Sequence, residues 1–263
     1  MKLQIENLDY GYTKRVIGRS LNFSVDAGEI LCVLGPNGSG KTTLFRTLLG
    51  LLPTHGGKIV LEQKSLVDWP RTRLAKAIGY VPQAHAAYFA FSVREIVLMG
   101  RTAHIGIFSL PSESDKRMAE DSLKTLGIAQ LADKPYTEIS GGERQLTLIA
   151  RALAQGSQLL IMDEPTASLD FGNQIRVLRQ FAALAATGIG IVFSTHDPDH
   201  ALNYADRVLM LKDGGLLQCG RPDEVVTGDN LQQLYGVKVA VESIAESHPR
   251  HARRRRTCVP LAD

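Results

Sequence analysis

The sequence predicts an α/β fold in which a mostly parallel sheet is combined with an inserted helical segment. An apolar run at Ile30–Leu34 and a continuous one at Leu159–Met162 predict strands, and the second is typical of a strand buried on both faces. Apolar residues recur at helical spacing after these runs, over 44–49 and 171–186. Between about 84 and 155 helical spacing dominates. We therefore expect an α/β core that carries a helical insertion.

The other elements follow from the same two periodicities, taken along the chain. Alternating apolar residues over 2–34 predict strands that form an antiparallel β subdomain next to the core. Gly50–Pro53 ends the first helix, because glycine and proline interrupt helical structure. Further strands are predicted at 56–61, 78–81, 189–193, 207–212 and 215–219, and helices at 70–77 and 229–235.

The chain of 263 residues is long enough for one large domain with a subdomain. Residues 1–83 and 156–240 are expected to form the core together with the β subdomain, and residues 84–155 the helical subdomain. Residues 241–263 are expected to be a basic, disordered tail.

Positive charge is concentrated near the C-terminus. The formal net charge is +3, yet five arginines lie between Arg250 and Arg256, so the rest of the chain is net negative. The body therefore shows no sign of a nucleic-acid footprint, and no nucleic-acid partner is expected. A solvated tail explains the arginines, and a weak contact with anionic lipid is the alternative.

Cysteine usage and hydropathy indicate the compartment. Cys32, Cys219 and Cys258 are far apart and lack metal-ligand spacing, which is typical of a reducing cytoplasm. No stretch approaches the roughly 18 apolar residues of a spanning helix, and the N-terminus lacks an apolar signal core. We expect an untargeted protein.

A glycine-rich segment joins the strand at 30–34 to the following helix, and it matches the pattern G-x-x-x-x-G-K-[ST]. Glycines let successive backbone N–H groups point inward, and the helix adds the positive end of its dipole. Lys41 is expected to reach the β- and γ-phosphates of a nucleotide, and Thr42 to ligate Mg²⁺. The predicted nucleotide-binding residues are Gly35, Pro36, Asn37, Gly38, Ser39, Gly40, Lys41, Thr42 and Thr43.

Polar residues follow three predicted strands. Asp163 and Glu164 come directly after Leu159–Met162; Asp163 is expected to hold Mg²⁺ and Glu164 to polarise the attacking water, with an ordinary surface turn as the alternative. Gln83 could contact the metal and the water, and His196 the γ-phosphate. A structural histidine is the alternative for His196.

Ser140 begins a predicted helix and Glu143 follows three residues later, which is the pattern of a capping box. Ser140, Gly141 and Gly142 at a helix N-terminus also fit an anion site, because small residues allow close backbone approach. A second anion site in another subdomain suggests a nucleotide bound between two copies of the chain.

In their order and approximate spacing, these motifs resemble those of the ATP-binding subunits of ABC transporters, over about residues 3–235. The loop at 35–42 resembles Walker A and the segment at 159–163 resembles Walker B. Ile139–Glu143 resembles the signature, but it differs from the usual Leu-Ser-Gly-Gly-Gln at both ends.

The resemblance also assigns roles to single residues. It implies that Gln83 is the Q-loop glutamine, Glu164 the catalytic glutamate and His196 the switch histidine. Asp170 closes a segment that resembles the D-loop. The catalytic residues implied are thus Glu164, His196, Lys41 and Gln83, and the metal ligands are Thr42, Gln83 and Asp163.

The implied fold is a P-loop NTPase core of the ABC ATPase type, and the implied cofactors are ATP and Mg²⁺. Two copies would close head to tail, with each ATP between Walker A of one and Ser140–Gly142 of the other. Tyr12 is the aromatic expected to stack on adenine, and Tyr10 is the alternative.

The resemblance further implies partners and a location. Separate polytopic permease subunits would hold the chain at the cytoplasmic face of the inner or plasma membrane, and a substrate-binding protein would take part indirectly. Tyr88, Phe89 and Phe91 lie where the family docks its permease. They are permease contacts or, equally, part of the helical subdomain's interior.

The segments 97–101 and 195–201 resemble importers of iron–siderophore, haem and cobalamin and, in some members, molybdate. An iron chelate is the preferred substrate, with molybdate or tungstate next. A soluble ABC ATPase that scaffolds iron–sulfur assembly is the alternative of another class. A DNA-repair or chromosome ATPase is disfavoured, since no heptad run occurs.

Overall fold

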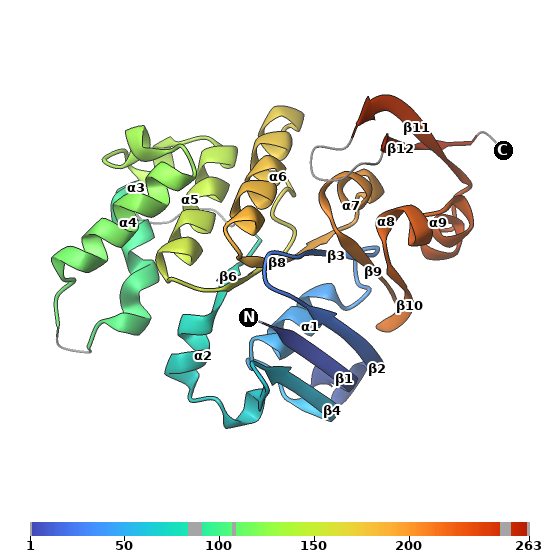
Figure 1. The fold of residues 1–263 in the computed structure, drawn as a ribbon, viewed down its shortest axis with the longest axis horizontal. Helices are drawn as coiled ribbons and strands as arrows, with labels where there is room; N and C mark the ends of the chain where they lie inside the picture. Colours follow the sequence, from blue (N-terminus) through green and yellow to red (C-terminus); the bar gives the residue numbers. More distant parts are fainter. Residues whose placement is uncertain (1, 84–90, 107–108, 248–253, 262–263) are drawn as a thin grey trace. The chain divides into compact units, whose positions relative to one another are not determined.

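The computed structural model describes residues 2–83, 91–106, 109–247 and 254–261 (Figure 1). They form two compact units: the first comprises residues 1–68 and 181–263, and the second residues 69–180. Helices and strands alternate in both, which confirms the predicted α/β fold. The second unit is wider than the helical segment expected at 84–155, because it includes two strands of the core.

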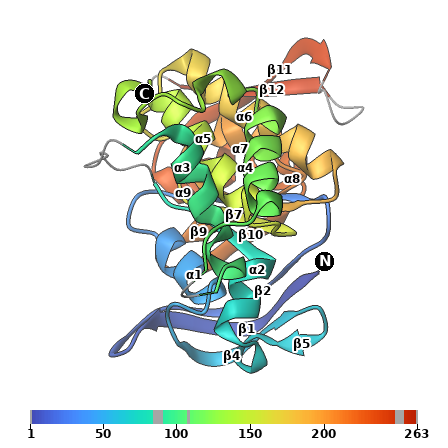
Figure 2. The ribbon, with the colours of Figure 1, turned by 90° about the vertical axis from the view of Figure 1, so that its left-hand side faces the viewer.

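The first unit begins with an antiparallel sheet in the order β2-β1-β4-β5. Its strands are β1 (Leu3–Tyr12), β2 (Arg15–Val25), β4 (Thr54–Leu61) and β5 (Lys64–Ser65), followed by the 3-10 turn η1 (Leu66–Asp68). Leu3, Ile5, Leu8 and Tyr10 of β1 are buried, and helix α1 (Lys41–Leu48) packs against this strand (Figures 1 and 2). This is the predicted β subdomain.

The first unit also holds the strand that leads into the phosphate loop. Strand β3 (Ile30–Leu34) runs parallel to both β8 (Gly190–Thr195) and β9 (Arg207–Lys212), and β10 (Gly215–Gly220) pairs antiparallel with β9. Every residue of β3 and β8 is buried. Leu34 pairs with Thr195, so the phosphate loop and His196 leave the sheet at the same edge.

Helices α7 (Pro198–Tyr204), α8 (Pro222–Val225) and α9 (Gly228–Tyr235) complete this unit with strands β11 (Val239–Ser247) and β12 (Arg254–Pro260). The two strands pair antiparallel, and β12 packs against α7. The prediction of a disordered tail from residue 241 is therefore wrong for 241–247 and 254–260. Residues 254–260 form a strand despite their high arginine content, because the backbone of this strand hydrogen-bonds to β11 and to side chains of α7.

The second unit pairs β6 (Ile78–Val81) in parallel with β7 (Leu159–Met162), after helix α2 (Arg71–Ala77). Its helices α3 (Val93–Leu98), α4 (Glu113–Thr125) and α5 (Gly141–Ala154) pack against one another (Figures 1 and 2). Short 3-10 turns lie between them at Met99–His104, Ala129–Leu131 and Tyr136–Glu138. Helix α6 (Phe171–Ala186) starts in this unit and ends in the first.

Arg101 ties the helices of the second unit together. Its Nε donates to Asp115 Oδ1 of α4 at 2.8 Å, and Nη1 donates to the Ala154 carbonyl at the end of α5 at 2.9 Å. Hydrogen bonds from the Ser112 hydroxyl, and then from Arg101, lower the pKa of Asp115 to about 2. The ionised pair thus persists at neutral pH.

Among the helices that the structure describes, none combines the length and the apolar character needed to cross a membrane.

Candidate functional site

The phosphate loop has a backbone that favours glycine. Gly38 and Gly40 have φ of 83° and 99°, a region that side chains with a Cβ rarely adopt. A Cβ at Gly40 would also lie 2.9 Å from the Tyr10 hydroxyl. The Gly35 N–H donates to the Thr195 carbonyl at 3.2 Å, which joins the start of the loop to the end of β8. The sequence motif and the backbone therefore agree.

Two side chains of the loop are buried and polar. Lys41 is 5% exposed, and its Nζ donates to the carbonyls of Gly35 at 2.8 Å and Pro36 at 3.0 Å, so the cation lies over the loop. Ser39 is 2% exposed, and within the described residues its hydroxyl has no hydrogen-bond partner. Leaving such a group unsatisfied costs about 1–3 kcal/mol. A phosphate oxygen fits both the hydroxyl and the charge.

The two tyrosines near the loop differ in burial. Tyr10 is fully buried, its hydroxyl donates to the Gly214 carbonyl at 3.2 Å, and burial raises its pKa well above the ordinary value. The Gly214 N–H in turn donates to the Ser39 carbonyl at 3.0 Å, so Tyr10 supports the loop from the core. Tyr10 is thus not available to stack on a base. Tyr12 is 43% exposed, and its contact with adenine stays a prediction.

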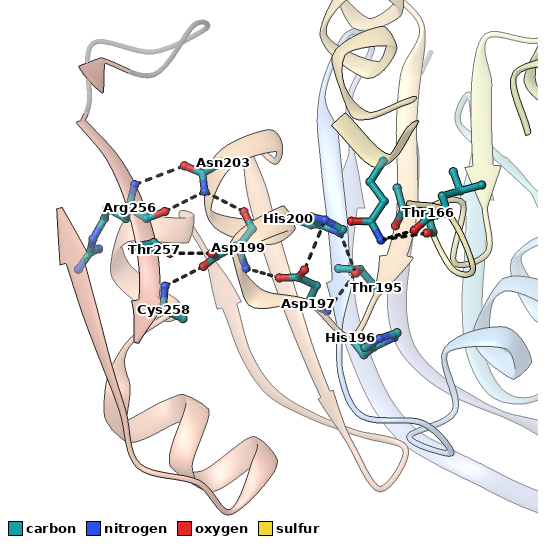
Figure 3. A network of polar contacts seen from close by, with 12 residues as sticks. Thr166, Thr195, His196, Asp197, Asp199, His200, Asn203, Arg256, Thr257 and Cys258 are labelled. Carbon is teal, nitrogen blue, oxygen red and sulfur yellow. Dashed lines mark hydrogen bonds and ion pairs between the residues drawn. The ribbon is translucent and has the colours of Figure 1, made fainter. Parts of the chain in front are cut away.

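His196 follows β8 and has an exposed side chain, while its carbonyl accepts a hydrogen bond from the Tyr235 hydroxyl at 2.8 Å. The next residue, Asp197, caps α7 by accepting from the Asp199 N–H at 2.8 Å. The buried His200 lies 3.4 Å from Asp197 through Nε2 (Figure 3). The contacts of Asp197 and His200 were not predicted from the sequence, although Asp-Pro-Asp-His is a recognisable helix start with proline in the first turn.

His200 makes the stability of this turn depend on pH. Burial lowers its pKa from the ordinary 6.5, and the carboxylates of Asp197 and Asp199 oppose the shift only in part, while His196 adds to it. The unfolded chain therefore binds the proton more readily than the folded chain does. The stability contributed by the buried, neutral His200 is fully present above about pH 6.5 and is lost as the pH falls below that value.

Acidification from about pH 7.5 to about pH 5.5 is expected to lower the melting temperature more in the wild type than in His200→Gln, which cannot take up the proton. Thermal melts followed by circular dichroism at both pH values test this. An equal drop in the two proteins would show that other groups carry the acid sensitivity.

In the second unit, Asp163 and Glu164 leave β7 beside the end of β6. The Asp163 N–H donates to the Val81 carbonyl at 2.9 Å, and the Asp163 side chain is only 4% exposed. Gln83, two residues after Val81, is exposed at the same edge. The register thus brings these three predicted residues to one edge.

The loop after β7 holds strained backbone. Glu164 and Ser168 have φ of 44° and 66°, the left-handed region that favours glycine. Such residues cost of order 1–3 kcal/mol each and cluster at functional sites. A surface turn of adjacent acids does not require this conformation, so the strain favours a functional role for the loop.

The predicted capping box is present at the start of α5. Ser140 N–H and Oγ both donate to Glu143 Oε2 at 2.8 Å, and the Glu143 N–H donates back to Ser140 Oγ at 3.3 Å. The bond from the Ser140 N–H, followed by that from its hydroxyl, lowers the pKa of Glu143. The box does not exclude an anion site, since Ser140 and Gly141 are exposed.

Gly142 explains why the helix start needs small residues. A Cβ at Gly142 would lie 2.3 Å from Asn173 Oδ1 in the first turn of α6. Asn173 in turn donates from its backbone N–H and from Nδ2 to Asp170, at 2.8 and 2.9 Å. The segment that resembles the D-loop and the segment that resembles the signature therefore meet within the second unit.

The predicted site residues fall into two groups. The phosphate loop, Tyr12 and His196 belong to the first unit, and Gln83, Asp163, Glu164, Ser140–Gly142 and Asp170 to the second. Tyr88 and Phe89 lie outside the described residues; Phe91 is described, and 42% of it is exposed. No cluster of three or more His, Cys, Asp or Glu side chains suited to a metal occurs in the described part of the chain.

Comparison with known proteins identifies the family. The sequence model of the family described as ABC transporter matches residues 19–167, more than half of the chain. An ABC transporter ATP-binding protein of Haemophilus influenzae, described as uncharacterized, is 45% identical over 235 residues, 89% of each chain. A hemin import ATP-binding protein of Gloeobacter violaceus is 39% identical and covers 91% of this chain and 89% of its own.

A molybdate import ATP-binding protein of Haemophilus influenzae is also 39% identical, over 89% of this chain and 87% of its own. Among solved structures, an inward-facing conformation of a proposed metal-chelate type ABC transporter has a TM-score of 0.85 and 36% identity, with 99% of this chain and 97% of that chain covered. The chain therefore belongs to the ABC transporter family and is an ATP-binding ATPase of the ABC type.

Proposed function

We propose that this ATPase powers a binding-protein-dependent importer for an iron chelate of the siderophore, haem or cobalamin class. The observation that carries the proposal is the similarity to a hemin import subunit over 91% of the chain. The similarity to a proposed metal-chelate transporter over 99% of the chain supports the same substrate class.

In this proposal the phosphates of ATP occupy the loop at 35–43. The buried Lys41 ammonium lies over that loop, and the unsatisfied Ser39 hydroxyl would donate to a phosphate oxygen. Successive loop N–H groups and the first turn of α1 would complete the anion site. The exposed ring of Tyr12 would stack on adenine.

Mg²⁺ would be held by Thr42, Asp163 and Gln83, whose side chains supply the oxygen ligands that this cation prefers. When bound, the ion neutralises negative charge that develops on the phosphates. Glu164 would accept a proton from the attacking water, and His196 would hydrogen-bond the γ-phosphate. The strained backbone at Glu164 supports a specialised role for that carboxylate.

Two copies of the chain would enclose each ATP, with Ser140–Gly142 of one copy facing the phosphate loop of the other. Asp170 accepts hydrogen bonds from Asn173, whose side chain lies against Gly142, so Asp170 belongs to the same proposed interface. The Ser140 hydroxyl donates to Glu143 in the structure, and it would exchange that partner for the γ-phosphate when the copies close.

The partners follow from the importer proposal. Permease subunits would bind the ATPase at the cytoplasmic face of the membrane, and a substrate-binding protein would deliver the chelate from outside. Two alternatives remain: a molybdate or tungstate importer, supported by the molybdate import relative, and a soluble scaffold for iron–sulfur assembly.

A pull-down tests the proposal. Tagged Glu164→Gln protein, which should hold its complex in the ATP-bound state, is recovered from detergent-solubilised native membranes with Mg-ATP, and its partners are identified by mass spectrometry. Tagged Glu113→Gln is the matched control, because this exposed residue of α4 lies outside the site. A polytopic permease and a binding protein are expected in the Glu164→Gln sample.

Elemental analysis of the recovered binding protein then distinguishes the substrates. Iron or cobalt, the metal of cobalamin, supports the chelate class, whereas molybdenum or tungsten supports the alternative importer. Recovery of soluble partners only, with no membrane protein, would contradict the importer and favour the scaffold.

A further inference from the structure

The C-terminal hairpin β11–β12 is bound to the helix that follows His196 (Figure 3). The Thr257 hydroxyl donates to Asp199 Oδ2 at 2.7 Å, and the Cys258 N–H donates to Asp199 Oδ1 at 2.8 Å. Asn203 Nδ2 donates to the Arg256 carbonyl at 2.8 Å, and the Arg256 N–H donates to Asn203 Oδ1 at 3.3 Å. The side chains of Asp199 and Asn203 thus bond backbone groups of β12, as a second neighbouring strand would.

These contacts continue to the turn that carries His196. Asp199, held by β12, donates its N–H to the capping carboxylate of Asp197. The Asp197 N–H donates to Thr195 Oγ1 at 3.0 Å, and Thr195 Oγ1 lies 3.4 Å from Nδ1 of His200. The residues on both sides of His196 are therefore held within one polar network.

Tyr235, the last residue of α9, provides the second connection. Its hydroxyl donates to the backbone carbonyl of His196 itself at 2.8 Å. Helix α9 packs against β11, so the hairpin and Tyr235 belong to one C-terminal structure. This structure reaches the His196 turn twice, through β12 and α7 and through Tyr235.

We infer that helix α9 and the described strands β11 and β12 hold the turn around His196 so that its side chain is positioned for ATP hydrolysis, with Tyr235, Asp199 and Thr257 as positioning residues. The inference rests on the proposed role of His196. Helix α7 has only seven residues, and so short a helix is stable only through its caps and its contacts. A small displacement of a group that contacts the reacting phosphate lowers the rate of the chemical step.

The test uses the full-length chain with Mg-ATP and measures kcat and KM by phosphate release. Tyr235→Phe and Thr257→Val each remove one hydroxyl with little change of shape. Each is expected to lower kcat about 3- to 10-fold, the effect of one net hydrogen bond, while KM stays within about twofold. Val259→Thr is the matched control, since this side chain of β12 is exposed, and its kcat should not change.

Double variants separate positioning from stability. In a His196→Ala background, Tyr235→Phe and Thr257→Val are expected to cause no further loss of kcat, because the group that they position is gone. Losses that multiply in the double variants would show that the contacts act only on the fold, and would overturn the inference.

The His196→Ala variant separates a failure of this inference from a failure of the proposed role of His196. If His196→Ala lowers kcat but neither single variant does, this inference is wrong while the role of His196 stands. If His196→Ala leaves kcat unchanged, the proposed role of His196 fails and the inference fails with it.

Discussion

Lys41→Ala is expected to reduce ATP hydrolysis about 10²- to 10³-fold, the typical effect of removing one group that stabilises developing charge in a buried site. Lys41 is almost fully buried, and its Nζ is held over the phosphate loop by the hydrogen bonds that it donates to the Gly35 and Pro36 carbonyls. Alanine cannot supply the cation at the β- and γ-phosphates, so nucleotide affinity should fall as well. Phosphate release and binding of a fluorescent ATP analogue measure the two effects.

Lys64→Ala is the control for this variant, because Lys64 is an exposed lysine of the same unit, on β5. It should retain wild-type hydrolysis. The melting temperature of Lys41→Ala must also be compared with the wild type, since two hydrogen bonds within the loop are lost. Near-normal hydrolysis by folded Lys41→Ala protein would contradict the assignment of the phosphate loop.

Glu164→Gln is expected to lower hydrolysis about 10²- to 10⁴-fold, the usual contribution of a general base, while ATP still binds. Glutamine keeps the size of the side chain and removes the carboxylate that would accept the proton. Because the γ-phosphate then stays in place, two copies should remain closed around ATP. Gel filtration with and without Mg-ATP should show a dimer for the variant only when the nucleotide is present.

Glu113→Gln again serves as the control, and it should hydrolyse ATP normally and remain monomeric. A Glu164→Gln protein that binds ATP yet stays monomeric would count against the proposed enclosure of ATP between two copies. Unchanged hydrolysis would instead exclude Glu164 as the base and direct attention to other acidic residues near β7.

The elements near the site could be predicted from local sequence because their signals are short-range. The phosphate loop combines an apolar strand, glycines and a helix start within 20 residues, and its left-handed glycines were found where the motif requires them. Strand β7 and helix α6 were predicted within a residue or two, since each has a clean periodicity.

The C-terminal strands could not be predicted from local sequence. A run of arginines predicts solvated chain, yet Arg256 pairs with Asn203 through its backbone and Thr257 donates to Asp199. Backbone hydrogen bonds do not depend on side-chain type, so the amino-acid composition of this segment could not predict them. The adenine contact illustrates a second limit, because the sequence favoured Tyr12 but left Tyr10 as the alternative, and burial in the folded chain then made Tyr10 unavailable.

The α/β class, the phosphate loop and the acidic pair after β7 could each be predicted from residues close together along the chain. The resemblance to ABC ATPases followed from the order and spacing of such local motifs over about residues 3–235. The burial of Tyr10 in the core, the packing of Gly142 on Asn173 and the hydrogen bonds from the C-terminal hairpin to α7 could be seen only in the folded chain. Those contacts join residues far apart in the chain. They form because folding brings surfaces together, and no local pattern specifies which polar groups will then meet.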